Sequence, residues 1–163
     1  MKLFHGSYSN TAPVIKIGAY ALGSLDNVFD GLFASPDREV AASHGGNCVY
    51  SYVVDDGKIA TSSDLDARYE EVYAFLVSEL NISADDVAEI ADRVMSDDSS
   101  DITDFAEILS PRSDAFDGGE GDLSWELQRL RGRVAAHLGY DAVEMDDEHG
   151  TSYLIVNPAV TAE

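Results

Sequence analysis

The segment spanning residues 141–157 constrains the fold of this chain more than any other stretch. It consists of two short apolar runs separated by polar residues and by a turn at Gly150. Apolar runs of this length, bounded by turn-forming residues, are typical of paired strands. We therefore expect a terminal strand pair that holds three adjacent carboxylates at one edge of a sheet. The three acids are Asp146, Asp147 and Glu148.

The first third of the chain predicts one helix and three more strands. The predicted strands are residues 2–7, 31–35 and 47–54. The helix should begin at Ser35, because serine is a favourable N-cap and Pro36 follows it at the first helical position. It should end at the two glycines that follow His44.

The middle of the chain is acidic and has helical periodicity. Apolar residues at helical spacing form one stripe over residues 65–80, and Ser83 can cap a second helix. Residues 102–109 predict a short third helix. A fourth and longer helix carries a leucine-rich stripe over residues 123–138 and should end at Gly139.

The order of these elements indicates the fold class. Strands lie at both ends of the chain and helices lie between them, which predicts an α+β protein. A length of 163 residues fits one domain. We therefore expect a single domain over residues 1–163, in which residues 60–121 form an inserted acidic helical lobe.

The charge of the chain restricts its partners. It has 31 acidic and 10 basic residues, a formal net charge of −21. Such a surface is repelled by nucleic acids and anionic membranes, so we expect no direct nucleic-acid binding and no membrane binding. It suits a basic protein partner. Adaptation to high salt is an equally good explanation, and the presence of only three lysines fits that explanation too.

Neither a disulfide nor a metal site is predicted. Cys48 is the only cysteine, and its apolar alternating surroundings indicate a small buried residue. The four histidines lack ligand spacing, so we expect no structural metal. The chain has no apolar run of about 18 residues and no signal-peptide pattern at its start, which predicts a cytoplasmic protein.

Three short motifs, taken in order, resemble a known family. His5-Gly6-Ser7 ends the first predicted strand, residues 31–35 enter a helix that ends at His44, and residues 139–143 lead into the acidic turn and the final strand. This order resembles mono-ADP-ribosyltransferases. The run over residues 123–153 is similar to phage-encoded anti-CRISPR ADP-ribosyltransferases that block type I-F surveillance complexes.

The resemblance implies an ADP-ribosyltransferase-like core of two split β-sheets that binds NAD between them. It implies that His5 hydrogen-bonds a ribose and that the Gly6 backbone holds the nicotinamide amide. Where the family has a stacking tyrosine, this chain has His44. Each NAD-binding role has an alternative interpretation: His5 could be a solvent-facing histidine at the end of a strand, and Phe33 could pack in the core. The implied NAD-binding residues are His5, Gly6, Ser7, Phe33, Ala34, Ser35 and His44.

The catalytic acid is where the chain departs from the family pattern. The family's glutamate slot, just before the last apolar run, holds Ser152. Serine cannot stabilise the oxocarbenium-like ribose that forms when nicotinamide leaves, so an upstream acid should replace the glutamate. Strand alternation places Asp147 on the side of Val143 and Met145, which makes Asp147 the first choice and Glu148 the second. A merely hydrophilic turn is the alternative.

The resulting hypothesis is an NAD-dependent mono-ADP-ribosyltransferase that modifies a protein side chain. The resemblance implies an anti-CRISPR role in which a type I-F Cascade complex is inactivated. One alternative is a non-enzymatic acidic inhibitor that mimics DNA, and another is an ADP-ribosylating toxin with a different host target. Trp125, which falls off its helix's leucine stripe, should fill a gap beside the helical lobe, or else border the NAD cleft.

Overall fold

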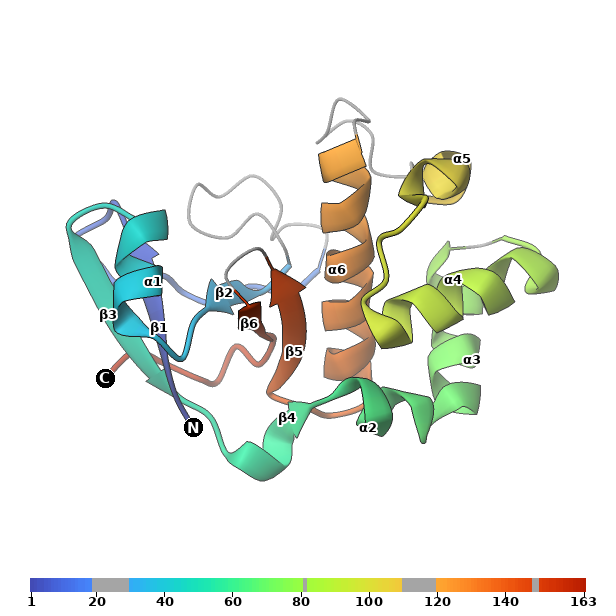
Figure 1. Cartoon of the computed structure of the whole chain (residues 1–163). Coiled ribbons are helices and arrows are strands. Elements are labelled where there is room, and N and C mark those ends of the chain that lie inside the picture. Colours follow the sequence, from blue (N-terminus) through green and yellow to red (C-terminus); the bar gives the residue numbers. More distant parts are fainter. Residues whose placement is uncertain (19–29, 81, 110–119, 148–149) are drawn as a thin grey trace.

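The computed structural model describes residues 1–18, 30–80, 82–109, 120–147 and 150–163. Its strands form two separate sheets, which confirms the expected α+β class and split core (Figure 1). One sheet pairs β1 (Lys2–Ser7) with β3 (Cys48–Val53) in antiparallel orientation. The other sheet has the order β2 (Leu32–Ala34), β6 (Gly150–Ile155), β5 (Ala142–Asp147), β4 (Ile59–Ala60).

The predicted terminal strand pair is present as β5 and β6. Its antiparallel register joins Ala142 to Ile155 and Asp147 to Gly150, which has a φ of 106° that favours glycine. The strand β4, which pairs in parallel with Ala142 and Val143, was not predicted. A two-residue strand is too short to show any periodicity, so only its partner reveals it.

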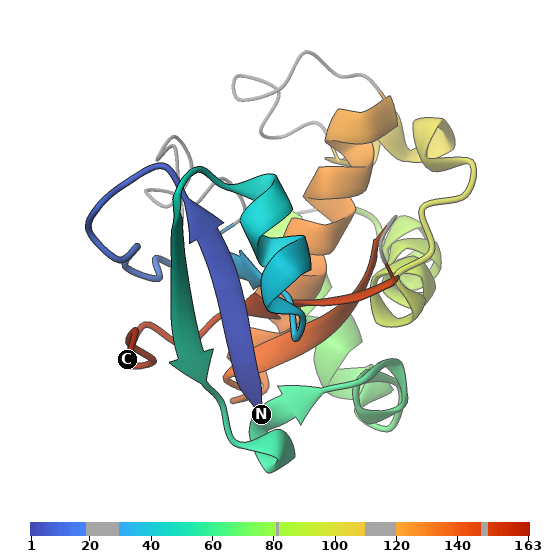
Figure 2. The same cartoon turned by 60° about the vertical axis from the view of Figure 1, so that its left-hand side comes forward.

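The helix α1 (Arg38–His44) packs against β1, and Figure 2 shows it beside the β1–β3 pair. Its predicted start is wrong by two residues: the N-cap is Asp37, whose carboxylate accepts hydrogen bonds from the backbone N–H groups of the first turn. The Ser35 hydroxyl instead accepts from the N–H of Asp37. Aspartate and serine are comparable caps, so the sequence alone did not separate them.

The helical middle lies beyond α6 from the β1–β3 sheet (Figure 1). The predicted single stripe over residues 65–80 is wrong, because the chain turns at Arg68 and divides it between two helices. The prediction that residues 60–121 are an insertion stays a prediction. The described helices of this middle part are α2 (Ser62–Asp66), α3 (Tyr69–Leu80), α4 (Ala84–Ser96), η3 (Ile102–Phe105) and α5 (Ala106–Leu109), and α6 (Glu120–His137) follows them.

Two apolar clusters cover the two faces of the four-stranded sheet. On one face, Val143, Met145 and Leu154 pack with α6 and the helical lobe. On the other face, Ala142 and Ile155 pack with the β1–β3 sheet. Alternation along β5 therefore assigns odd-numbered residues to the α6 side, as the sequence predicted for Asp147.

Among the described residues, no helix is both long and apolar enough to cross a membrane.

Candidate functional site

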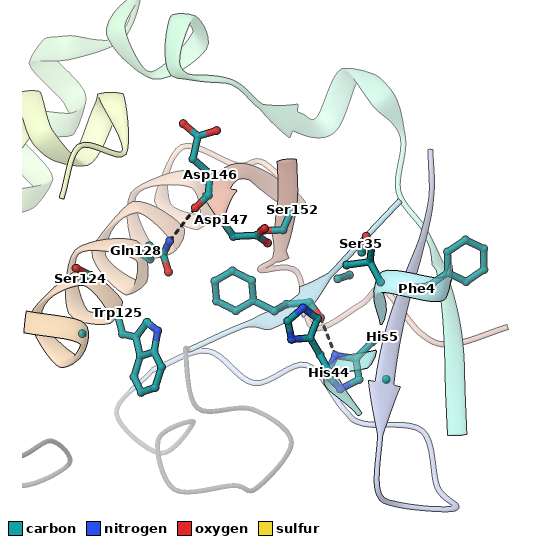
Figure 3. A pocket seen from close by; sticks show the side chains of 15 residues that line it. Phe4, His5, Ser35, His44, Ser124, Trp125, Gln128, Asp146, Asp147 and Ser152 are labelled. Carbon is teal, nitrogen blue, oxygen red and sulfur yellow. Dashed lines mark hydrogen bonds between the residues drawn. The ribbon is translucent and has the colours of Figure 1, made fainter. Parts of the chain in front are cut away.

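A pocket of about 560 Å³ opens between α6, the β5–β6 pair, and the edge where β1, β2 and α1 meet (Figure 3). A volume of this size is in the range that holds small molecules and cofactors. Its lining is mainly apolar and contains a few convergent polar groups. Segments from both ends of the chain contribute to it, as the three sequence motifs predicted.

The first wall contains most of the predicted NAD-binding residues. His5, Gly6, His44 and residues 33–35 all line the pocket. Two hydrogen bonds of 2.8 Å join the backbones of Phe4 and Ser35, so this bridge connects one sheet to the strand end of the other beside the pocket. Ser7 is the exception. It does not line the pocket, is fully buried, and accepts a hydrogen bond from the N–H of Ser9.

The histidine at the end of β1 has a defined orientation. His5 Nδ1 lies 2.6 Å from the carbonyl oxygen of Phe33 (Figure 3). A carbonyl can only accept, so Nδ1 must carry the hydrogen. In the neutral ring Nε2 is then an acceptor, and a sugar hydroxyl could donate to it.

The resemblance implied that the Gly6 backbone holds the nicotinamide amide, and the structure shows that close packing also requires glycine at this position. A Cβ at Gly6 would lie 2.0 Å from the carbonyl oxygen of Ala41 and 2.9 Å from the nitrogen of Gly45. A Cβ at Gly45 would lie 2.1 Å from the carbonyl carbon of Gly6. The two glycines therefore let the end of α1 contact β1 directly, which positions His44 beside His5.

The second wall comes from the first turns of α6. Ser124, Trp125 and Gln128 face the pocket from this side (Figure 3). The preferred interpretation of Trp125 as a gap-filler is wrong: its side chain is 45% exposed and borders the pocket. Trp125 does not belong to the leucine stripe of its helix. It therefore does not face the apolar core with the leucines, and it forms part of this wall instead.

The strand pair supplies the polar end of the pocket. Asp147 and Ser152 lie side by side there, whereas the carboxylate of Asp146 points away (Figure 3). The register explains this arrangement, since Ser152 pairs with Met145 and lies diagonally from Asp147 on the α6 face. Glu148, the second-choice acid, lies outside the described residues.

Ser152 has an unusual environment for a hydroxyl group. It is only 5% exposed, and its Oγ has no hydrogen-bond partner within the described parts of the chain. A buried hydroxyl without a partner costs roughly 1–3 kcal/mol. A bound molecule with a polar group at this position would remove that cost.

The backbone N–H and carbonyl oxygen of Asp146 are both held by side chains from other parts of the chain. Its N–H donates to the carboxylate of Asp97 at 2.7 Å, and its carbonyl oxygen accepts from Gln128 Nε2 at 3.3 Å. Asp97 follows α4 in the helical lobe. Burial raises the pKa of the Asp97 carboxyl above its ordinary value, while the hydrogen bond from Asp146 opposes that shift. Nothing in the sequence indicated the roles of Asp97 and Gln128, because the residue that they hold lies on another element.

The pocket has a negative character. None of the described residues that line it is lysine or arginine. Asp146 and Asp147 both line it, and of these two acids only Asp147 directs its carboxylate toward the pocket. The nearby arginines of α6 have other partners: Arg129 pairs with Glu126 and Asp30, away from the pocket. A carboxylate beside an apolar cavity favours a cationic group or a developing positive charge.

Comparisons with known proteins show the family of this chain. All of residues 1–163 match the model of a family described as the anti-CRISPR type I-F ADP-ribosyltransferase AcrIF11. A crystal structure of an anti-CRISPR protein is 31% identical, with a TM-score of 0.66 over 100% of this chain and 93% of that one. No curated protein matches. The match along the whole chain shows that this protein belongs to the AcrIF11 family of anti-CRISPR ADP-ribosyltransferases, which are NAD⁺-dependent transferases.

Proposed function

We propose that the pocket binds NAD⁺ and that Asp147 is the acid that assists transfer of ADP-ribose to a protein side chain. The observation that carries this proposal is the position of Asp147 and Ser152 opposite His5 and His44 in one cavity. The residues present fit NAD⁺, the donor of ADP-ribose. His5 Nε2 can accept a hydrogen bond from a ribose hydroxyl, and the buried Ser152 Oγ can form a hydrogen bond with the bound molecule.

Asp147 supplies the charge that the reaction needs. The bond between nicotinamide nitrogen and ribose C1′ breaks, the electron pair leaves with nicotinamide, and positive charge develops on the ribose. The carboxylate of Asp147, which lies on the exposed α6 face of β5, stabilises the positive charge on the ribose. The acceptor side chain then bonds to C1′ and its proton passes to Asp147 or to solvent.

Ser152 and Asp147 share the task that one glutamate performs in the family pattern. Ser152 occupies the glutamate position but has no charge, and Asp147 is its diagonal neighbour on the same face. The backbones of diagonal cross-strand neighbours lie about 7–8 Å apart, so the side chains of two such residues can contact the same ligand. We infer that Asp147 supplies the charge and Ser152 the hydrogen bond.

The experiment compares two neighbouring acids. The protein is incubated with labelled NAD⁺ and a purified type I-F surveillance complex, and label transfer is measured together with a mass shift on each subunit. Asp147→Asn should lower transfer about 10²–10³-fold, as the loss of one electrostatic group does in other enzymes. Asp146→Asn is the matched control, because that carboxylate points away from the pocket, and it should retain activity.

The proposed target is a basic surface of the type I-F surveillance complex. The net charge of −21 favours docking on a face that otherwise binds nucleic acid. Transfer should therefore fall as salt is raised, because surface charges are screened. Stoichiometric inhibition that persists without NAD⁺ would support the DNA-mimic alternative, and transfer only to other host proteins would support the toxin alternative.

A further inference from the structure

Within the described residues, no strand other than the short β4 pairs with the outer edge of β5. β4 pairs only with Ala142 and Val143, near the start of β5. Beyond them, the carbonyl oxygen of Glu144 accepts from Arg131 Nε at 2.9 Å. The N–H and carbonyl oxygen of Asp146 bond to Asp97 and Gln128. Side chains from α6 and from the residue after α4 therefore replace a neighbouring strand along this edge.

The lobe that carries Asp97 is itself fixed to the same edge. Arg131 is 1% exposed, and besides Glu144 it donates to the carbonyl oxygens of Val94 and Met95 in the last turn of α4. A cation at the C-terminal end of a helix satisfies carbonyls that lack helical partners. One arginine thus joins the end of α4 to β5, and Asp97 follows that end directly.

We propose that Asp97 is a positioning residue for the reaction, so that the helical lobe fixes the place of the acid on β5. This inference rests on the proposed role of Asp147. Asp97 holds the N–H of Asp146, the residue directly before Asp147, and Gln128 holds the carbonyl of the same residue. Asp146, the residue directly before Asp147, is therefore held at its N–H by the lobe and at its carbonyl oxygen by the pocket wall.

The geometry of Asp97 permits a clean substitution. Its backbone is left-handed, with φ 56° and ψ 38°, at the C-cap of α4. Glycine adopts that conformation without strain, so Asp97→Gly removes the acceptor and leaves the backbone intact. Asparagine also tolerates it, and Asp97→Asn keeps an acceptor oxygen for the N–H of Asp146.

The lobe offers a matched control. Asp101 is also left-handed, with a φ of 50°, is exposed, and makes no side-chain capping hydrogen bond. Asp101→Gly therefore removes the same charge from the same lobe at the same kind of backbone position. Any effect of charge loss or of glycine alone should appear in both variants.

The test measures nicotinamide release from NAD⁺ in the presence of purified type I-F surveillance complex, together with thermal unfolding. Asp97→Gly should lower kcat about tenfold or more, because displacements near 1 Å have such effects, with little change in the KM for NAD⁺. Asp97→Asn should restore kcat, and Asp101→Gly should match the unchanged protein.

Several outcomes would overturn the inference. These are unchanged kcat in Asp97→Gly, equal loss in Asp97→Gly and Asp101→Gly, or equal loss in Asp97→Gly and Asp97→Asn. Asp147→Asn is measured in parallel. If it keeps full activity, the proposed site is wrong; if it loses activity while Asp97→Gly does not, only the positioning role is wrong.

Discussion

The contact between Gly6 and α1 allows a quantitative prediction about the first wall of the pocket. In Gly6→Ala the new Cβ would lie 2.0 Å from the Ala41 carbonyl oxygen, and ordinary contact begins at 3.4 Å, so the two must separate by about 1.4 Å. The two nearest atoms, the Ala41 carbonyl oxygen and the Gly45 nitrogen, belong to the backbone and cannot rotate away as a side chain can. α1 must therefore move as a unit, together with His44 at its end.

The expected cost follows from overpacking. Such insertions destabilise by roughly 1–3 kcal/mol, and the severity of this overlap places Gly6→Ala at about 3 kcal/mol. For a chain of this size that lowers Tm by roughly 6–12 °C. Because His44 moves with α1 while His5 stays on β1, we also expect NAD⁺ binding to weaken by about tenfold or more.

The assay is denaturant and thermal unfolding combined with calorimetric titration of NAD⁺. Gly45→Ala should behave similarly, since it inserts a methyl group into the same contact from the other side. The two changes together should cost less than their sum, because the first already separates the helix from the strand. Gly121→Ala is the control for stability alone, because Gly121 lines the pocket but none of the described residues lies within 4 Å of its new Cβ. A Gly6→Ala protein with the stability of that control would refute the reasoning.

Three further predictions concern buried charge and the second wall. Asp30→Asn should destabilise by about 3 kcal/mol or more, measured as a lower urea midpoint with unchanged slope, because Asp30 is fully buried and pairs with Arg129 and Arg133. Trp125→Ala should leave the unfolding free energy within about 0.5 kcal/mol, since the side chain is 45% exposed, but should raise the KM for NAD⁺ or for the acceptor in steady-state kinetics. Asp97→Asn should be more stable than the unchanged protein at neutral pH, because burial raises the pKa of this carboxyl in the folded state and its ionised form carries a cost there. That advantage should disappear in urea titrations as the pH falls below the ordinary pKa of 3.8, where the carboxyl is protonated in both states; a constant advantage at every pH would contradict the assignment.

Much of the fold could be predicted because the elements have local patterns. The strand over residues 2–7 was predicted at its observed bounds, and the terminal strand pair follows from two apolar runs around a turn. The boundaries that were wrong lie where two residues serve equally well, as with Ser35 and Asp37, or where a periodic stripe continues through a turn, as at Arg68. Local sequence does not record which of two adequate caps the surrounding structure uses.

The sequence by itself determined which residues could reach the pocket. The resemblance of the motifs to a known family selected His5, Phe33 and His44, and strand alternation assigned Asp147 to the face of Met145. Motif order and strand alternation both depend on neighbours along the chain. They could therefore be predicted without knowing the packing.

Only the tertiary structure decided how those residues are held. The close contact of Gly6 with α1, the position of Trp125 beside the cavity, and the hydrogen bond from Asp146 to Asp97 all join segments that are distant in sequence. Contacts of this kind depend on the relative placement of helices and sheets, which no local periodicity encodes. For the same reason, the sequence showed only that Ser152 departs from the family pattern. The structure shows that its hydroxyl group is buried and that the residue lines the pocket.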